Sequence, residues 1–432
     1  MTQWISISEA SAHCGERVEL RGWVVNQRDS GRVKFILLRD GSGTIQTTIW
    51  SKDPENPLFK AFAALTLESS LKVRGTINAD SRAPGGYELQ VDDLEPVHIA
   101  ADYPIARKSH GTAFLMKHRH LWLRSQRQTA ILRIRAAIIA AIRDFMDSRG
   151  FVLTDAPILT GNAAEGTTTL FETKYFGESA YLSQSGQLYV EATAMALGKV
   201  YTFGPTFRAE KSKTRRHLIE FWMMEPEWAF AELDDIIQLS ESLLVEVVAR
   251  VLDRHREDLK ILERDTAPLE KIVAPFPRIT YDEAFALLRE SGESETPYGE
   301  DLGGTDETIL SGRFDRPLAI THYPADVKAF YMQPDAQDPT KVLCVDFIAP
   351  EGYGEIIGGS QRIHDLGLLE EKIAAQGLSR DAFEWYLDLR RFGSVPHSGF
   401  GLGIERTVAW ICKLQHIRES IPFPRMLYNL YP

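Results

Sequence analysis

The chain has few cysteines and no long apolar run. Its 432 residues contain only three cysteines, at positions 14, 344 and 412. They lie too far apart in the sequence to form a metal-binding motif or a disulfide framework. Few and scattered cysteines are typical of proteins in a reducing compartment. No stretch of about 18 uncharged apolar residues is present, which excludes a membrane-spanning helix. The first five residues lack the basic and apolar segments of a secretion signal, so we expect a soluble, cytoplasmic protein.

Positive net charge is also lacking. The formal net charge is −11, whereas nucleic-acid-binding domains are often basic. The positive residues are nevertheless concentrated in two segments. Residues 107–135 contain eight Lys and Arg and no acidic residue, and residues 211–216 read Lys-Ser-Lys-Thr-Arg-Arg. Such segments favour contact with a phosphate backbone, although an amphipathic helix and a solvated loop would have the same composition.

The length of the chain predicts two or three domains. Five short alternating segments and a helical stretch near residues 59–65 predict a small closed β-barrel of the OB type over residues 1–100. Such barrels bind single-stranded nucleic acid, but a barrel without a ligand would show the same strands. Residues 101–125 contain Pro104 and the start of the first basic segment, and we expect them to form a linker or hinge.

Residues 126–432 predict the second domain. Apolar residues from Ile131 to Phe145 keep helical spacing, and the segments that follow lack the regular βαβ alternation of a parallel sheet. We therefore expect an α+β catalytic domain on an antiparallel sheet. Residues from about 235 to 315 are charged and helical, then rich in loops, and are expected to form an insertion region.

The most informative block is a predicted hairpin over residues 202–227. Its first strand leads into Arg208 and Glu210, and its second carries Phe221 and Glu225 on one face, because side chains alternate along a strand. An arginine, a flat ring and carboxylates facing one cleft suit a nucleotide, whose phosphate the arginine binds and whose base the ring stacks on. Ordinary cross-strand ion pairs would account for any two of these residues, but less well for the whole set.

Two further blocks carry chemistry. Residues 398–410 read as a glycine-rich strand passing into a helix, with Arg406 early in that helix, where it can reach a phosphate. Asp346 and Glu355 lie on neighbouring predicted strands, and one or two carboxylates can hold Mg²⁺ together with phosphate and water. Taken alone, a glycine-rich turn is a weak signal, and two acids near a turn are more often solvated.

Together these blocks resemble the class II aminoacyl-tRNA synthetases. The strand ending in Asp155-Ala156-Pro157 is similar to the first motif of that class, which forms its dimer interface. Phe207-Arg208-Ala209-Glu210 with the loop through Glu227 is similar to the second motif, and Gly401-Leu402-Gly403-Ile404-Glu405-Arg406 to the third. An OB barrel before the catalytic domain is similar to the subgroup that charges aspartate, asparagine and lysine. The resemblance covers nearly the whole chain. It implies a homodimeric ligase that uses ATP and Mg²⁺, forms an aminoacyl-adenylate and transfers the acyl group to the 3′-terminal adenosine of a tRNA.

Within this subgroup the predicted pocket favours asparagine. The aspartyl enzymes normally read QSPQLYK where this chain has Gln184–Val190, so Gly186 replaces the proline and Val190 replaces a lysine that helps to neutralise the substrate. Burial of a substrate carboxylate without enough positive charge costs several kcal/mol. Glu225 stands where those enzymes usually have aspartate and can accept the N–H groups of an amide, while Arg362 remains to donate to the amide oxygen. L-asparagine and tRNA(Asn) are therefore the expected substrates.

Three alternatives stay open at this point. A non-discriminating aspartyl enzyme would share the motifs, but Val190 and Glu225 argue against it. A paralogue that makes asparagine through an adenylate, without tRNA, would have no use for the barrel or the basic linker. A plain OB-type RNA-binding protein would not need the second and third motifs.

The resemblance also implies a role for each matching residue. Arg208 and Arg406 would be catalytic. Glu165 and Gln187 would hold the α-amino end of the substrate, and Phe221 and Arg406 would enclose adenine. Asp346 and Glu355, nine residues apart, would hold Mg²⁺. The complete sets are Arg208, Glu210, His217, Phe221, Glu355 and Arg406 for ATP, and Glu165, Gln187, Val190, Glu225, Ser360 and Arg362 for the amino acid.

The same resemblance places an anticodon-reading site on the barrel. Arg28, Phe35 and Gln46 match positions at which the subgroup reads the central anticodon uridine. Base stacking on an aromatic side chain contributes roughly 1–3 kcal/mol. Packing of Phe35 in the core of its strand is the alternative.

Overall fold

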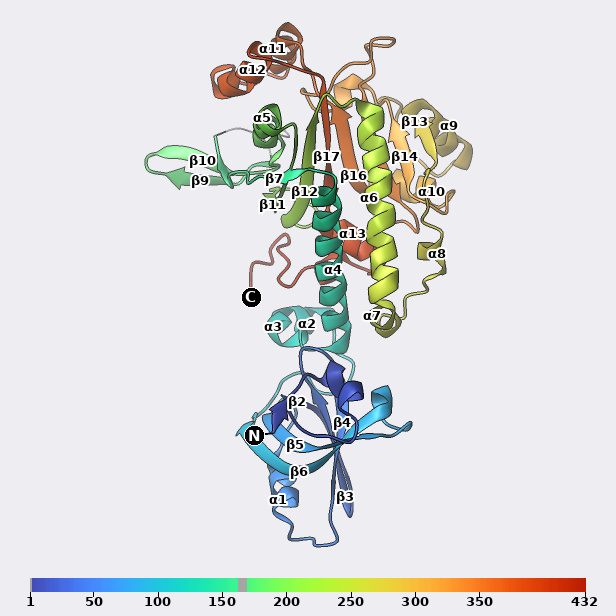
Figure 1. Cartoon of the computed structure of the whole chain (residues 1–432). Coiled ribbons are helices and arrows are strands. Elements are labelled where there is room, and N and C mark those ends of the chain that lie inside the picture. The colour runs from blue at the N-terminus through green and yellow to red at the C-terminus, as the bar shows by residue number, and fades with distance from the viewer. Residues whose placement is uncertain (1, 162–168) are drawn as a thin grey trace. The chain divides into compact units, whose positions relative to one another are not determined.

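The computed structural model describes residues 2–161 and 169–432 of the chain. These fall into two compact units, residues 1–111 and residues 112–432 (Figure 1). The first unit holds the barrel and the second holds the large sheet, so the predicted α+β fold class is confirmed. None of the helices in the described residues combines the length and the apolar character that a membrane span requires.

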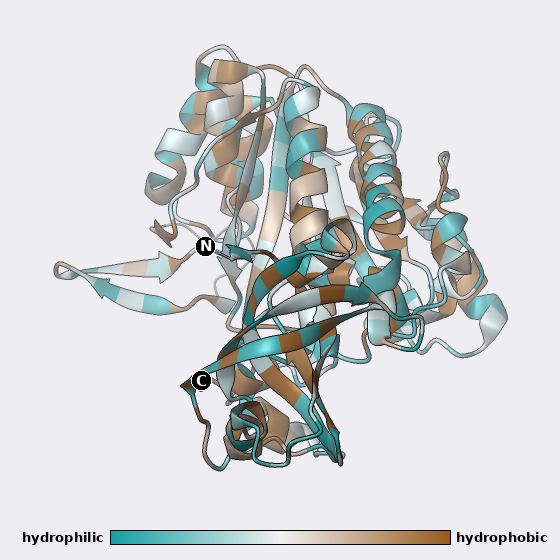
Figure 2. Cartoon of the chain, turned by 60° about the horizontal axis from the view of Figure 1, so that its bottom comes forward, coloured by the Kyte–Doolittle hydropathy of each residue, from teal (hydrophilic) through white to brown (hydrophobic). Residues whose placement is uncertain are grey.

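The first unit is a barrel that closes through β2. Its strand order is β1-β2-β3-β4-β6-β5, and β2 also pairs with β5. Apolar and polar residues alternate along the long strands, which appears as brown and teal bands in Figure 2, and the apolar side chains fill the interior. The elements are β1 (Gln3–Trp4), β2 (Arg17–Ser30), β3 (Val33–Arg39), β4 (Thr44–Trp50), α1 (Pro57–Ala64), β5 (Ser70–Ala79) and β6 (Tyr87–His98).

The second unit is built on an eight-stranded sheet with the order β13-β14-β15-β16-β17-β12-β11-β7. The central pairs are antiparallel, as expected, whereas the edge pairs β13–β14 and β7–β11 are parallel, so the sheet is mixed. The strands are β7 (Val152–Leu153), β11 (Lys199–Phe207), β12 (Glu220–Ala229), β13 (Arg278–Thr280), β14 (Leu318–Thr321), β15 (Cys344–Ala349), β16 (Gly354–Gln361) and β17 (His397–Gly403).

Two long helices, α4 (Gln126–Ser148) and α6 (Leu233–Arg254), share one hydrophobic core with this sheet. On α4, Ile131, Ile134 and Ile138 recur at helical spacing and are fully buried. On α6 the buried face includes Leu243, Leu244, Val247 and Val251. The prediction that an insertion begins near residue 235 is therefore wrong for this helix, since its charged residues mark only the outer face of a core element.

The later part of the expected insertion also joins the main sheet. β13 pairs with β14, and α9 packs its buried Tyr281 and Phe285 into a second hydrophobic cluster that includes residues of β14 and β15. Only short stretches between these elements are loops, such as residues 292–303. The helices here are α7 (Arg256–Ile261), α8 (Ala267–Glu270), α9 (Tyr281–Ser291) and α10 (Gly304–Ser311).

The linker is shorter than the expected 101–125. β6 ends at His98, and α2 (Thr112–Lys117) and α3 (Arg119–Trp122) already belong to the second unit. Arg119 is 1% exposed, and its guanidinium donates to Oε1 of Gln128 and to two backbone carbonyls near the end of the chain. Part of the basic segment is therefore structural, which composition alone could not reveal.

The remaining elements surround the sheet. A small sheet has the order β8-β10-β9. The short helices α5 and α12 contact each other, and α13 directly follows β17. These elements are β8 (Leu159–Thr160), β9 (Glu172–Tyr175), β10 (Glu178–Leu182), α5 (Gln187–Leu197), α11 (Leu366–Ala375), α12 (Glu384–Arg391) and α13 (Ile404–Ile411).

Candidate active site

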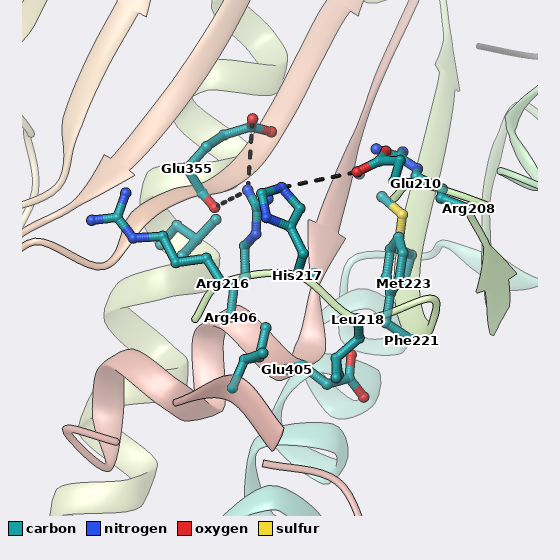
Figure 3. A pocket seen from close by; sticks show the side chains of 14 residues that line it. Arg208, Glu210, Arg216, His217, Leu218, Phe221, Met223, Glu355, Glu405 and Arg406 are labelled. Carbon is teal, nitrogen blue, oxygen red and sulfur yellow. Dashed lines mark hydrogen bonds and ion pairs between the residues drawn. The ribbon is translucent and has the colours of Figure 1, made fainter. Parts of the chain in front are cut away.

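A cavity of about 120 Å³ lies beside β12, β16 and the start of α13 (Figure 3). The side chains that point into it come from three separate regions of the sequence, which the sheet brings together. All six residues assigned to ATP from the sequence line this cavity: Arg208, Glu210, His217, Phe221, Glu355 and Arg406. The structure thus gathers the complete predicted nucleotide set in one place.

The hairpin of β11 and β12 positions Arg208 against Phe221. The backbone N–H of Arg208 donates to the carbonyl of Ile219 at 2.9 Å, which extends the hairpin beyond the last residue of β11. The guanidinium carbon of Arg208 then lies 5.4 Å from the centre of the Phe221 ring. Met223 follows on the same face of β12 and pairs with Gly403 of β17. The end of its side chain reaches Gly401, where a β-carbon would collide with Cε of Met223.

Two sets of contacts position Arg406: those that hold the start of helix α13 in place and those of its own guanidinium group. The neighbouring Glu405 is buried, pairs with Arg135 at 2.7 Å and accepts the backbone N–H of Trp222 at 2.9 Å. These bonds fix the start of α13 against β12 and α4. The Arg406 guanidinium donates to the backbone carbonyl of Glu355 at 2.8 Å and lies 3.8 Å from its carboxylate.

His217 lies between the basic loop and the cavity. It bonds to the hydroxyl of Thr214 and lies 3.9 Å from the carboxylate of Glu210. Burial lowers the pKa of His217, and the nearby Arg406 lowers it further. The neutral ring, which can donate one hydrogen bond and accept another, is therefore favoured at neutral pH.

A second cavity, of about 480 Å³, adjoins the first. Gln187, Glu225 and Arg362 line it, as do both carboxylates assigned to the metal. Arg208 and Glu355 line both cavities. A ligand group in the second cavity can therefore meet a nucleotide phosphate in the first, with Arg208 at the junction.

Glu225 is fixed in the second cavity by residues just before α5. The hydroxyl of Ser185 donates to one carboxylate oxygen of Glu225, and the backbone N–H of Gly186 donates to the other at 2.9 Å. Glu225 is 4% exposed. Burial together with two donors orients the carboxylate and leaves it able to accept further hydrogen bonds, since an ionised carboxylate has about four acceptor sites.

Arg362 is fixed by a residue for which the sequence suggested no role. Its guanidinium donates to Glu227 at 3.1 Å from Nε and at 2.5 Å from Nη2, and its Nη1 donates to Ser360 at 2.5 Å. Burial alone would lower the pKa of Arg362, but Glu227 raises it more, so the guanidinium stays charged. These contacts use three of its five N–H groups. The alternation of Glu225 and Glu227 on β12 could have indicated Glu227.

Two residues assigned to the amino acid, Val190 and Ser360, do not line the second cavity. Val190 is 1% exposed and packs with Ala194 and Val200, so the predicted contact with the amino acid is wrong, because this face of α5 turns toward the sheet. Ser360 is fully buried and acts on the cavity through Arg362. Glu165 lies outside the described residues.

The predicted metal residues converge over Gly358. A β-carbon at this glycine would lie 2.8 Å from Oε1 of Glu355 and 3.4 Å from Oδ1 of Asp346. Burial raises the pKa of Glu355 to about 7, and the Asp346 carboxylate adds to the shift, although 39% of the Glu355 side chain remains accessible. Two close carboxylates that resist joint ionisation suit a hard divalent cation.

Lys328 is a second residue that the sequence did not indicate. Its ammonium lies 2.8 Å from Oδ2 of Asp346 and 3.3 Å from Asp301. Burial alone would lower the pKa of Lys328, but Asp346 and Asp301 raise it more. One carboxylate of the pair therefore carries an internal counter-ion, and no local sequence pattern around residue 328 marks it.

The barrel residues Arg28, Phe35 and Gln46 lie on one face. Arg28 pairs with Phe35 across β2 and β3, with its guanidinium carbon 4.4 Å from the ring centre. Gln46 lies opposite Leu37, two residues beyond Phe35. Ile36 is fully buried on the other face of β3, so Phe35 points away from the barrel core. Gln46 donates to Glu88 at 3.1 Å.

Comparisons with known proteins agree with this geometry. The family described as tRNA synthetases class II (D, K and N) matches residues 111–427, and the OB-fold nucleic acid binding domain matches residues 18–97. The chain is similar to the asparagine–tRNA ligase of Symbiobacterium thermophilum, with 58% identity over 436 residues and all of both chains covered. It is also similar to that of Chloroflexus aurantiacus, with 57% identity, 99% of this chain and 98% of the relative being covered.

A solved structure shows the same relationship. The asparaginyl-tRNA synthetase of Pyrococcus horikoshii complexed with asparaginyl-adenylate matches over the whole of both chains, with a TM-score of 0.97 and 43% identity. The chain therefore belongs to the class II tRNA synthetases of the D, K and N type and, within them, to the family of the asparagine–tRNA ligases.

Proposed function

We propose that this enzyme attaches L-asparagine to tRNA(Asn) in two steps that consume ATP. The observation that carries the proposal is the junction of the two cavities at Arg208 and Glu355. The family relationship supports it, since the matching Pyrococcus horikoshii protein was solved with asparaginyl-adenylate. A non-discriminating aspartyl enzyme is less well supported, because Glu225 lines the amino-acid cavity and would repel a substrate carboxylate.

In the first step the substrate carboxylate attacks the α-phosphate of ATP, and pyrophosphate leaves. Arg208, at the junction, binds both reacting groups and holds them in line, since orientation and charge stabilisation are the main contributions a protein makes to phosphoryl-type transfers. Phe221 and Arg406 enclose the adenine, and His217 and Glu210 bind the phosphate end. No covalent protein nucleophile is required for this reaction.

The side chain of the substrate is read at the far end of the second cavity. Arg362 donates to the amide oxygen, and Glu225 accepts the amide N–H groups. Gln187, at the start of α5, binds the α-ammonium group. A carboxylate in the same place would face Glu225, and like charges in a buried site repel strongly.

Asp346 and Glu355 would hold Mg²⁺, which when bound neutralises charge on the phosphate oxygens. Before ATP binds, Lys328 occupies one side of Asp346. Glu355 is also positioned by Arg406, whose guanidinium donates to its backbone carbonyl. The two carboxylates are therefore pre-positioned on adjacent strands, β15 and β16.

In the second step a ribose hydroxyl of the terminal tRNA adenosine attacks the adenylate carbonyl, and AMP leaves. The resemblance to the class favours the 3′-hydroxyl. The anticodon would be read by the face of the barrel that carries Arg28, Phe35 and Gln46, with Phe35 stacking on a base. We place the reaction in the cytoplasm, where tRNA is charged.

A homodimer is part of the proposal. Val152, Leu153, Ile158 and Leu159, on either side of the first motif, are 38–46% exposed. Several large apolar side chains exposed within one short segment favour an interaction surface. A second copy of this chain, paired through the same segment, would cover them.

The test is ATP–pyrophosphate exchange by the purified protein without tRNA, with asparagine or aspartate as the substrate. Exchange that depends on asparagine supports the proposed amide pocket. Exchange that depends on aspartate instead would leave the family and fold intact and would contradict the proposed substrate.

A further inference from the structure

A buried polar cluster is centred on Glu191 of α5, which contacts Gln187 in the wall of the second cavity. Glu191 is fully buried. Its carboxylate accepts hydrogen bonds from Arg390 at 2.7 Å, from Tyr386 at 2.8 and 2.9 Å, and from the His397 ring at 2.9 Å. These partners come from α12 and β17, so one carboxylate ties three elements together.

The same carboxylate also holds a residue that faces the substrate. Nε2 of Gln187 donates to Oε1 of Glu191 at 3.0 Å, one helical turn away. An ionised carboxylate only accepts hydrogen bonds, so the NH₂ group of Gln187 must face Glu191. The carbonyl oxygen of Gln187 is then left to face the cavity, as binding of an α-ammonium group requires.

Glu191 remains negatively charged in this buried position. Burial alone would raise the pKa of Glu191, but Arg390 and His397 lower it more, and the pKa lies well below its usual value. The negative charge of Glu191 also interacts electrostatically with Arg362 and Glu227 and contributes to raising the pKa of each. The cluster and the substrate-reading arginine therefore belong to one electrostatic group.

The charges of this group do not favour an anionic substrate. Two guanidinium groups, of Arg362 and Arg390, lie among the carboxyl groups of Glu191, Glu225 and Glu227, and burial raises the pKa of Glu227 to about 7. The group therefore has no surplus of positive charge. A substrate amide is neutral and needs only hydrogen bonds. A substrate carboxylate would need a surplus of positive charge, because a buried ion without compensation is strongly disfavoured.

We propose that Glu191 is a positioning and specificity-determining residue, which aims the Gln187 amide at the substrate ammonium and adds the negative charge that excludes aspartate. This inference rests on the proposed function. Glu191 acts through Gln187 and Arg362 and does not line the cavity itself.

The experiment compares Glu191→Gln with Tyr386→Phe in ATP–pyrophosphate exchange, with asparagine and with aspartate. Glu191→Gln removes the charge and allows the Gln187 amide to turn. The KM for asparagine should rise, and the ratio of kcat/KM for asparagine to that for aspartate should fall by about tenfold or more. Tyr386→Phe removes one hydrogen bond from the same carboxylate without changing its charge, and its ratio should stay within about twofold of wild type.

The two failures can be told apart. A wild-type protein that prefers aspartate contradicts the proposed function. A wild-type preference for asparagine that Glu191→Gln leaves unchanged, in the ratio and in KM, overturns the role of Glu191. An equal fall of the ratio in Tyr386→Phe also overturns it, because loss of packing would then explain both variants.

A second variant covers the case in which Glu191→Gln does not fold. Glu191→Asp keeps the charge but shortens the reach to Gln187. It should raise the KM for asparagine and leave the ratio near the wild-type value. An unchanged KM for asparagine would contradict the positioning role of Glu191. A fall in the ratio of kcat/KM for asparagine to that for aspartate would contradict the claim that the charge alone, and not its position, excludes aspartate.

Discussion

The backbone N–H of Gly186 donates to Oε2 of Glu225 at 2.9 Å. Proline, which the aspartyl pattern has at position 186, carries no N–H and could not make this bond. The two departures from that pattern, Gly186 and Glu225, are therefore coupled, since the glycine supplies a donor that orients the longer carboxylate. A β-carbon at Gly186 would also lie only 2.9 Å from the side chains of Ala156 and Thr202, so the position is sterically closed as well.

Gly186→Pro and Gly186→Ala separate these two effects. Both introduce a β-carbon, but only proline removes the donor. We expect Gly186→Pro to lower kcat/KM for asparagine by about tenfold more than Gly186→Ala, since loss of a hydrogen bond to a charged group costs roughly 1.5–3 kcal/mol. Steady-state pyrophosphate exchange measures this difference. Equal losses in the two variants would show that crowding alone matters and that the N–H of Gly186 does not.

We expect adenylate formation to depend strongly on Arg208, so that even the conservative change to lysine lowers its rate severely. Its planar guanidinium can bind a carboxylate and a phosphate together, whereas an ammonium group cannot reproduce that geometry. Arg208→Lys and Arg208→Ala should both lower the exchange rate by about three orders of magnitude or more. Lys211→Ala, in the exposed part of the same loop, serves as the control. Near wild-type exchange in Arg208→Ala would refute the role of this residue.

The stability of the ligand-free protein should depend on the ionisation of Glu355. Burial raises its pKa to about 7 from the ordinary value of 4.5, so the folded state binds this proton more tightly than the unfolded chain does. Stability from this group is thus present at low pH and is lost as pH rises from about 4.5 through 7. Glu355→Gln should raise the unfolding temperature at pH 8 and change it little at pH 5.

Thermal unfolding followed by circular dichroism, without metal or nucleotide, tests this expectation. Glu257→Gln is the matched control, because the Glu257 side chain is 87% exposed. A stabilisation of equal size at pH 5 and pH 8 would mean that charge at Glu355 is not its source.

Phe35 should affect the tRNA step without affecting adenylate formation. Its ring lies on the outer face of β3, beside Arg28. Loss of one base stack costs roughly 1–3 kcal/mol, so Phe35→Ala should weaken tRNA charging by about five- to a hundredfold and leave pyrophosphate exchange unchanged. Phe35→Tyr keeps a ring and should retain most of the charging rate. Equal charging by Phe35→Ala and wild type would remove Phe35 from the anticodon site.

The sequence reveals those parts of the site that short local patterns carry. The hairpin from Thr202 to Glu227 and the helix at Arg406 could be placed because strand alternation and glycine spacing fix which side chains share a face. Val190 was misplaced, because its match to the lysine of the aspartyl pattern does not say which face of α5 turns toward the sheet, where Val190 packs with Val200. Lys328 could not be found, because its role as a counter-ion depends on Asp346 and Asp301, and only the tertiary fold brings these two residues near it.

The fold shows the same limit. The core helix α6 carries many charged residues, and composition alone made it look like part of an insertion. Its buried face becomes evident from Leu243, Val247 and Val251, which lie in the same core as α4. The parallel edges of the sheet, at β7 and β13, consist of two and three residues, and strands of that length leave almost no periodic signal.

The most direct test of the central claim is aminoacylation of tRNA(Asn) by the purified protein, with labelled asparagine in one reaction and labelled aspartate in the other. We predict asparaginyl-tRNA(Asn) in the first and no product above background in the second. Efficient charging with aspartate would contradict the amide pocket built from Glu225 and Arg362. Adenylate formation with asparagine but no charged tRNA would show an enzyme that activates the amino acid without transferring it.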